Sequence, residues 1–179
     1  LAAMEGHFVT GKRAPLRLGG IPDEATRTTP YSLEIPGALS FLAFSDFDAE
    51  VKGLDAFPES DWPPVAITHI AFQVMVGLGS LMAFASLWAA WCWIRRREVA
   101  DSRLLLLLLT VLTPAGFIAL EAGWVVTEVG RQPWIVQGIM RTADAVTPMP
   151  GLVFPLVAFT LLYLFLGVIV FWLLRAQIW

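Results

Sequence analysis

The sequence predicts an all-α membrane protein, in which three transmembrane helices follow a long extramembrane loop and form part of a larger helical bundle. Of its 179 residues, 57% are hydrophobic and only 15% are charged, which is far from the balance of a soluble domain. The mean hydropathy is +0.68. Three apolar stretches are each long enough to cross a hydrocarbon layer of about 30 Å. Together these observations place the chain in a membrane.

Residues 1–66 form the predicted loop. They are polar, rich in Pro, Gly, Asp and Glu, and lack a sustained apolar period, which is typical of an extramembrane segment. Loops of this length tend to be functional or disordered, so this one is a candidate for handling a substrate. We expect a short helix at residues 1–8. His7 and His69 are expected to be solvated or to cap helices rather than to bind a metal.

The three transmembrane helices are predicted at residues 67–94, 104–129 and 151–174, where the apolar stretches lie. At 1.5 Å per residue, each is long enough to span a membrane with some tilt. Pro114 removes a backbone donor and predicts a kink in the second helix. Residues 130–150 then form the loop between the second and third helices.

The arginines predict the orientation of the chain in the membrane. Four of them, at positions 95–97 and 103, lie between the first two helices. By the positive-inside rule this turn is cytoplasmic, so residues 1–66 and 130–150 lie on the outer side. The net charge of −3 leaves no basic surplus for phosphate contacts, so no nucleic-acid partner is expected.

Two carboxylates interrupt the second apolar helix, Glu121 and Glu128. A carboxylate in an apolar span is costly unless it is protonated, paired or bound to metal, which makes both residues functional candidates. Seven residues apart, they lie within about 20° on one helix face, with Trp124 between them. We expect this stripe to face protein interior. A structural alternative pairs Glu128 with Arg131, and another gives Glu121 a hydrogen bond to a neighbouring helix.

The same helix carries a stripe of small residues. Such a stripe fits close helix packing or, equally, room for a bulky cofactor. The residues alone leave these two interpretations open. The stripe consists of Gly116, Ala119, Gly123, Thr127 and Gly130.

Met75 lies in the first predicted helix, with Gly77 and Gly79 close by. Methionine in a membrane helix ordinarily serves packing, but its thioether sulfur is also a known axial ligand of haem iron. Gln73, in the same helix, needs a hydrogen-bond partner. Both interpretations of Met75 remain open at this level.

One motif identifies a family. The run from Gly123 to Trp134, GWVVTEVGRQPW, followed by Arg141 and Thr142, resembles the GWxxxExGRQPW signature of subunit I of cytochrome bd quinol oxidases. The motif is long and specific. It makes a transporter interpretation of Glu121 and Glu128 much weaker.

Two further segments resemble the same family in the same order. Leu1–Glu5, LAAME, is similar to the end of the KLAAxE stretch in the family's quinol-binding loop, and Met75–Gly79, MVGLG, is similar to its MVGLG segment. The resemblance covers the whole chain, as the C-terminal half of subunit I. The chain starts at Leu1, and we expect it to be a piece of a longer polypeptide.

The resemblance implies a terminal oxidase of the bacterial cytoplasmic (inner) membrane that oxidises quinol, reduces O2 to water and generates a proton gradient. The implied cofactors are a low-spin haem b, a high-spin haem b and haem d. The implied partners are the N-terminal half of subunit I, which carries the histidine ligands, subunit II, a small accessory subunit and membrane lipid.

The resemblance also implies roles for single residues. Met75 matches the axial ligand of the low-spin haem b, Glu128 matches the carboxylate ligand of the high-spin haem b, and Glu5 matches a loop glutamate that takes part in quinol oxidation. Gln73 stands where the family has an arginine, so a cationic role is not carried over. Glu121 is expected to relay protons to the oxygen-reducing haems.

The signature residues around Glu128 are expected to bind cofactor. Arg131 is the candidate to pair with a haem propionate, and Gln132 and Trp134 would complete the outer lid of the haem pocket with it. Trp124 lies on the same helix face as Glu128.

Two alternatives to a haem d oxidase stay open. One is a cyanide-insensitive bd-type oxidase with haem b in place of haem d. The other is a non-catalytic membrane scaffold subunit without haem. The choice between ubiquinol and menaquinol is also open.

Overall fold

The structure is a computed structural model that describes residues 1–96, 102–146 and 148–178. It is mostly helical, and three helical spans are long and apolar enough to cross a membrane: Val65–Arg95, Arg103–Val129 and Val153–Gln177. The predicted fold class is therefore confirmed. Arg97, one of the arginines used for orientation, lies outside the described residues. The chain divides into two compact units, residues 1–144 and 145–179.

The first long helix, α2, runs from Val65 to Arg96 without interruption and has 32 residues. At 1.5 Å per residue it is about 48 Å long, well above the roughly 30 Å of a hydrocarbon layer. It starts directly after Pro64, whose carbonyl accepts a hydrogen bond from the Thr68 amide at 3.1 Å. The predicted stretch 67–94 lies inside these bounds.

The second span is broken into two helices, α3 (Arg103–Val111) and α4 (Ala115–Val129). The break falls at Pro114, where a kink was predicted, because proline has no amide hydrogen to continue the helical ladder. The kink is confirmed. The chain turns there and resumes as α4 in the first residue after the proline.

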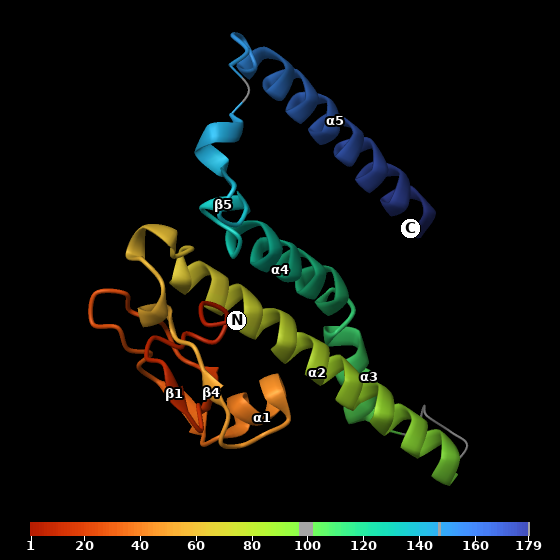
Figure 1. The fold of residues 1–179 in the computed structure, drawn as a ribbon. Helices are drawn as coiled ribbons and strands as arrows, with labels where there is room; N and C mark the ends of the chain where they lie inside the picture. The colour runs from red at the N-terminus through yellow and green to blue at the C-terminus, as the bar shows by residue number, and fades with distance from the viewer. Residues whose placement is uncertain (97–101, 147, 179) are drawn as a thin grey trace. The chain divides into compact units, whose positions relative to one another are not determined.

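Helix α4 packs along α2, and Figure 1 shows the two side by side. Near the break, Ala85 of α2 packs with Leu112 and Ala115 in a small buried cluster. Two alanines in this cluster allow the backbones to approach closely. Helices α2 and α4 thus form an antiparallel pair within the first unit.

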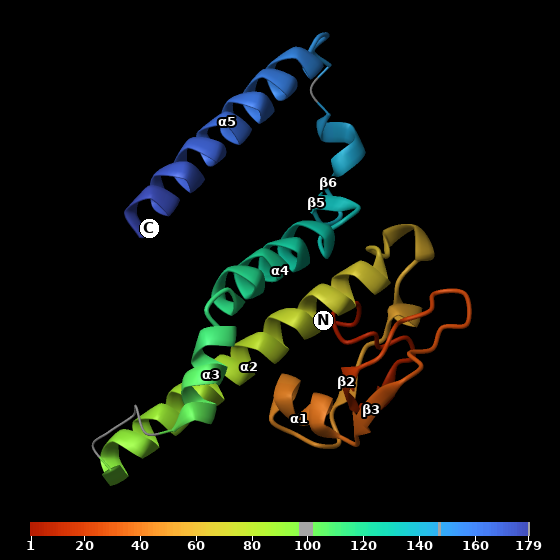
Figure 2. The ribbon, with the colours of Figure 1, turned by 180° about the vertical axis from the view of Figure 1, so that it is seen from behind.

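The segment before α2 is a folded substructure of short elements. Two small clusters hold it together, one of Ala3, Phe8, Leu54 and Val65 and one of Ala14, Leu39 and Val51. Figure 2 shows these elements beside α2. They are β1 (Gly11–Lys12) paired with β4 (Glu50–Val51), β2 (Leu16–Gly19) paired with β3 (Ser32–Ile35), α1 (Ala38–Phe44), and the 3-10 turns η1 (Leu54–Ala56) and η2 (Glu59–Asp61).

The short helix expected at residues 1–8 is wrong. The chain makes a single turn, in which the Glu5 amide donates to the Leu1 carbonyl at 3.0 Å. Gly6 then adopts φ +59°, a left-handed conformation that ends a helix and suits glycine. A side chain at Gly6 would also lie 2.9 Å from the Thr29 Oγ1.

After α4 the chain forms a small hairpin, β5 (Trp134–Val136) with β6 (Met140–Arg141), followed by the 3-10 turn η3 (Thr142–Ala145). This hairpin contains the end of the GRQPW run.

The second unit is built around α5 (Val153–Ile178). Its side chains are exposed on all sides through residue 177. A helix that is apolar all round belongs in lipid or among other membrane helices.

Candidate functional site

Glu5 lies in the turn that opens the folded loop. Its side chain is only 4% exposed, and its Oε2 has no hydrogen-bond partner among the described residues. Burial raises the pKa of the Glu5 carboxyl, and the positive charge of Arg17 partly opposes this. A buried carboxyl with a free oxygen can accept a hydrogen bond or a proton from a bound molecule.

His7 lies two residues further on and is equally buried, at 4% exposure. The expectation that it is solvated is wrong. Neither ring nitrogen has a hydrogen-bond partner within the described parts of the chain. Burial lowers the pKa of His7, and the Arg17 guanidinium lowers it further. Its backbone is fixed because its carbonyl accepts from the Leu54 amide at 3.0 Å, which places it in the loop core.

His69 and Gln73, one turn apart on α2, hold the loop against this helix. His69 is fully buried, so its expected solvation is also wrong. Its Nδ1 lies 2.8 Å from the Met4 carbonyl oxygen and its Nε2 lies 3.1 Å from that of Gly19. The Gln73 side chain accepts from the Gly19 amide at 3.1 Å and donates to the Arg17 carbonyl at 2.9 Å. Gln73 therefore has the partners that it was expected to need.

Met75 follows Gln73 by two residues on α2 and lies at the contact between α2 and α4. A Cβ added to Gly123 would be only 2.9 Å from the Met75 Sδ. The small residue at 123 therefore leaves room for the sulfur. A Cβ at Gly116, Gly77 or Gly79 would meet no atom within 4 Å. Close packing therefore explains the small residue at Gly123. At Gly116 the space is empty, so packing within the described residues does not explain the small residue there.

Glu128 and Trp124 are adjacent on α4, where the Trp124 Nε1 donates to the Glu128 Oε1 at 3.2 Å. Trp124 is 61% exposed, and Glu121 and Glu128 are exposed as well. No ion pair joins Arg131 to Glu128 in the described structure. The stripe of Glu121, Trp124 and Glu128 lies on a face of α4 that the described residues leave uncovered.

The candidate iron ligands fit single bonds to haem. The Met75 thioether lies at the contact between α2 and α4, where Gly123 leaves room for it, and the exposed Glu128 carboxylate accepts a hydrogen bond from Trp124. Both groups are known ligands of iron. Within the described ranges, no group of three or more His, Cys, Asp or Glu side chains could hold a metal ion. Each candidate thus offers one ligand.

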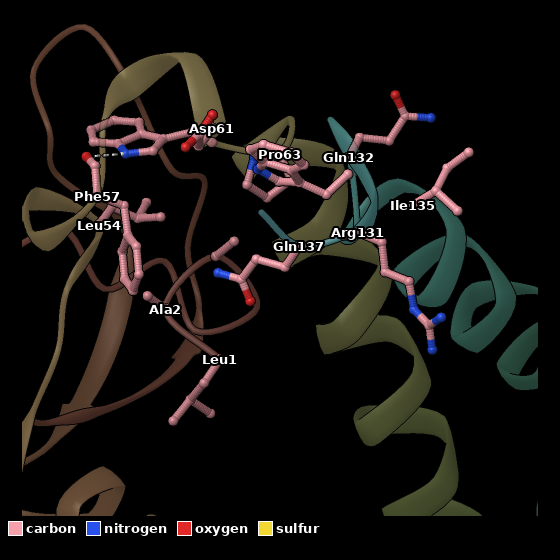
Figure 3. A pocket seen from close by; sticks show the side chains of 14 residues that line it. Leu1, Ala2, Leu54, Phe57, Asp61, Pro63, Arg131, Gln132, Ile135 and Gln137 are labelled. Atoms are coloured by element: carbon pink, nitrogen blue, oxygen red, sulfur yellow. Dashed lines mark hydrogen bonds between the residues drawn. The ribbon is translucent and has the colours of Figure 1, made fainter. Parts of the chain in front are cut away.

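A cavity of about 440 Å³ separates the loop from the GRQPW hairpin. Arg131, Gln132 and Trp134, predicted to bind cofactor, line one side of it. Figure 3 shows Gln137 reaching across toward Ala2, whereas the Arg131 guanidinium is directed away from the loop residues. The loop side is formed by Leu1, Ala2, Ala3, Leu54 and Phe57, with Asp61, Trp62 and Pro63 just before the start of α2.

Arg141 is a residue whose role sequence reasoning missed. Its Nη2 donates to the Asp61 Oδ1 at 2.7 Å, and its guanidinium lies 4.7 Å from the centre of the Trp134 ring. It therefore connects the hairpin to the loop and supports one wall of the cavity. The sequence shows Arg141 only as the end of a motif, because Asp61 lies 80 residues away.

Comparison with known proteins agrees with this architecture. Residues 1–179 match the family described as cytochrome bd terminal oxidase subunit I. Two proteins of Bacillus subtilis (strain 168) are similar. One, provisionally named cytochrome bd menaquinol oxidase subunit I, is 38% identical over 175 residues, covering 97% of this chain and 39% of that protein. The other, cytochrome bd ubiquinol oxidase subunit 1, is 34% identical over 191 aligned positions, covering 99% and 41%.

A solved structure, that of the bd oxidase from Geobacillus thermodenitrificans, matches with a TM-score of 0.76 and 42% sequence identity. The match covers 93% of this chain and 38% of that one. The chain spans about two-fifths of the length of the relatives it matches. Because the family match extends over every residue, this chain belongs to the cytochrome bd terminal oxidase subunit I family.

Proposed function

We propose that this chain is the C-terminal part of the haem-bearing subunit of a bd-type terminal oxidase, which oxidises quinol and reduces O2 to water. Family membership supports the reaction class. The observation that carries the proposal is the Glu5 carboxyl, buried in the folded loop with one oxygen free of partners in the described structure. An unsatisfied buried acid is expected where a substrate completes its hydrogen bonds.

Residues 1–66 would be the C-terminal part of the quinol-binding loop. Glu5 would accept a hydrogen bond, and then a proton, from a quinol hydroxyl. The raised pKa of Glu5 favours this role, because a stronger base takes the proton more readily. The contacts of His69 and Gln73 hold the loop to α2 and fix the position of Glu5 beside the membrane helices.

Met75 would hold the low-spin haem b through its thioether, and Glu128 would hold the high-spin haem b through its carboxylate. Trp124 would orient the Glu128 carboxylate through its indole N–H. Arg131, which points away from the loop, would pair with a haem propionate next to Gln132 and Trp134. The haems, when bound, supply the transfer of electrons from quinol to O2. The other ligands, including those of haem d, would come from the N-terminal half of the subunit.

The complex would lie in the bacterial cytoplasmic membrane with subunit II, and residues 1–66 and 130–150 would face the outer side. Protons released from quinol would leave there. Protons used in O2 reduction would come from the cytoplasm, and Glu121, on the uncovered face of α4, would relay them. The separation of release and uptake would build a proton gradient.

Quinol-driven oxygen consumption by the purified complex tests the proposal. Glu5→Gln should lower this rate by about 10²-fold, within the range typical of general acid–base groups, while oxidation of an artificial donor that bypasses the loop persists. Glu50→Gln is the matched control, because Glu50 is an exposed glutamate of the same loop. Equal loss with both donors in Glu5→Gln would indicate a folding defect.

Haem content separates the remaining alternatives. Pyridine-haemochrome analysis of the complex should detect haem, and its absence would support a scaffold subunit. The reduced spectrum should show a far-red chlorin band if haem d is present. A complex with haem b alone would instead be the cyanide-insensitive type.

A further inference from the structure

His7 has no part in the mechanism described so far, yet its setting is unusual. The ring is 4% exposed. Neither nitrogen makes a hydrogen bond of good geometry among the residues that the structure describes, although the nearby Val51 backbone acts to raise the pKa of His7. His69, the other histidine of the chain, is buried with both nitrogens next to carbonyl oxygens. A buried imidazole that serves packing alone is expected to use its nitrogens as His69 does.

The position of His7 connects Glu5 with the surface of the loop. Gly6 alone separates the two residues, and its carbonyl accepts from the Arg17 Nη1 and the Thr29 Oγ1, both at 2.9 Å. These bonds fix the turn that carries both side chains. Glu5 and His7 are therefore held as consecutive buried titratable groups.

Charged groups of both signs act on His7. Asp55 and Glu34 are the acidic groups and are exposed, and Arg17 is the basic group and is largely buried. Asp55 lies at the surface, where the Thr10 amide donates to both of its carboxylate oxygens at 3.0 Å. Its own amide donates to the Phe8 carbonyl, next to His7, at 3.0 Å. A proton on His7 would therefore be two residues from the buried Glu5 and within the electrostatic influence of a solvated carboxylate.

We propose that His7 carries the quinol proton from Glu5 to solvent on the Asp55 side of the loop. This inference rests on the proposed quinol oxidation. It adds a proton-transfer residue and a release route to it.

The protons and electrons of quinol take separate routes. Each quinol loses two electrons and two protons, and its electrons pass to the haem oxidant that the proposed function supplies. The Glu5 carboxylate takes one hydroxyl proton at a time, and a neutral His7 nitrogen takes it from Glu5, directly or through one water. The other ring nitrogen releases a proton to solvent beside Asp55. Glu5 then returns to its starting state, and His7 returns to its starting tautomer by a ring flip or by proton exchange through water.

Burial shifts the proton affinities of Glu5 and His7 in opposite directions. It raises the pKa of Glu5 and lowers the pKa of His7. Both shifts act against the difference between the ordinary pKa values of the two groups, which are 4.5 for Glu5 and 6.5 for His7. His7 also stays neutral, and able to accept, at pH values below its ordinary pKa of 6.5.

The test uses the assembled oxidase with His7→Gln, which keeps a polar side chain of similar size but cannot ionise near neutral pH. We expect quinol-driven oxygen consumption to fall at least about tenfold, with haem spectra and artificial-donor oxidation unchanged. The part of the low-pH decline that protonation of His7 causes should disappear from the pH profile, while the part that protonation of Glu5 causes should remain. In His7→Ala, added imidazole should restore part of the rate.

Phe8→Leu is the matched control, because Phe8 is the adjacent residue and is 3% exposed. It disturbs the loop core without removing a titratable group, so it should keep the wild-type pH profile, and imidazole should have no effect on it. A His7→Gln complex with the wild-type rate and pH profile would overturn the relay and leave quinol oxidation intact. Loss of haem in both His7 variants would make His7 a packing residue and overturn it as well. A wild-type complex without quinol oxidation would instead overturn the proposed function.

Discussion

Glu5 and His7 keep unpartnered polar atoms in the core of the loop that the structure describes. A buried polar atom without a hydrogen bond costs about 1–3 kcal/mol. Such a cost is expected at a site whose groups must exchange protons or bind a substrate. Exposed neighbours pay no such cost: the Asp55 carboxylate is bonded to Thr10, and hydrogen bonding lowers its pKa.

The pH dependence of quinol oxidation follows from Glu5. The carboxylate form is the proton acceptor, and burial raises the pKa of Glu5 above 4.5. The rate should therefore rise with pH through that raised pKa and level off above it. Stopped-flow measurement of quinol oxidation across the acid range checks this, and Glu5→Gln should lack the rise. A rise that survives in Glu5→Gln and in His7→Gln would assign it to other groups.

Met75→Leu tests the proposed iron ligand on α2. Leucine keeps most of the volume against Gly123 but removes the donor sulfur. The low-spin haem b should become high-spin or be lost, and quinol oxidation should slow. Reduced-minus-oxidised optical spectra measure this. Met82→Leu, on the same helix and packed at the Ala85 cluster, is the matched control and should keep the low-spin spectrum. An unchanged spectrum in Met75→Leu would refute the ligand assignment.

At the scale of elements, the contact between α2 and α4 links packing to the candidate haem ligand. Gly123→Ala would place a Cβ 2.9 Å from the Met75 Sδ, so the methionine must move. The Sδ is near the end of a flexible side chain, so it can move at little cost in stability. We expect a melting temperature of the complex in detergent close to wild type and a shifted low-spin haem band.

Gly116→Ala is the matched control for that substitution, because a Cβ there meets nothing within 4 Å. Its melting temperature and spectrum should stay close to wild type. Equal effects of the two alanines on the low-spin band would contradict the coupling of Gly123 to Met75.

The ion pair between Arg141 and Asp61 holds the hairpin to the loop. Asp61→Asn removes the charge that pairs with Arg141, whose side chain is 42% exposed while that of Asp61 is 25% exposed. A partly exposed ion pair contributes about 1 kcal/mol or less, so the complex should remain folded. The cavity wall at Trp134 should loosen, which tryptophan-directed oxidation or limited proteolysis of the hairpin would detect. Asp48→Asn, in the highly exposed pair with Arg13, should have no such effect.

The helical elements were predictable because each depends on local chemistry. Length and apolar composition give the spans, and the missing amide of Pro114 gives the break between α3 and α4. The folded loop was not predictable, because its clusters join residues that are far apart in sequence, such as Phe8 with Leu54. For the same reason His7 and His69 read as solvated in a polar segment, although both are buried.

The motifs supplied the residues of the candidate site, and the structure adds their surroundings. The sequence placed Trp124 beside Glu128 on one helix face, and the structure adds the hydrogen bond between them. The link of Arg141 to Asp61 spans 80 positions, and no local pattern records it.

At the scale of the whole molecule, the length of α2 determines how far the loop would lie from the hydrocarbon layer. The helix is about 48 Å long, whereas a hydrocarbon layer is about 30 Å thick. If the Arg95 end of α2 lies at one interface, the first turns of α2 would extend beyond the other. His69 and Gln73 lie in these turns and bind the loop there, so their polar contacts do not need to enter the hydrocarbon. Quinol chemistry would then take place at the membrane surface, with α4 leading inward.

Glu121 is the proposed relay for protons taken up from the cytoplasmic side. Glu121 lies seven residues before Glu128 and shares its uncovered helix face. Glu121→Gln preserves shape and most hydrogen bonding but cannot ionise. In vesicles containing the assembled oxidase, this variant should retain all haems and slow proton uptake during O2 reduction at least about tenfold. Glu121→Asp keeps an ionisable group and should recover part of the rate. Proton release at the outer side would be limited by the same turnover. The proton gradient should therefore form more slowly in Glu121→Gln, although the complex keeps its haems. Normal uptake kinetics in Glu121→Gln would leave Glu121 with a purely structural role.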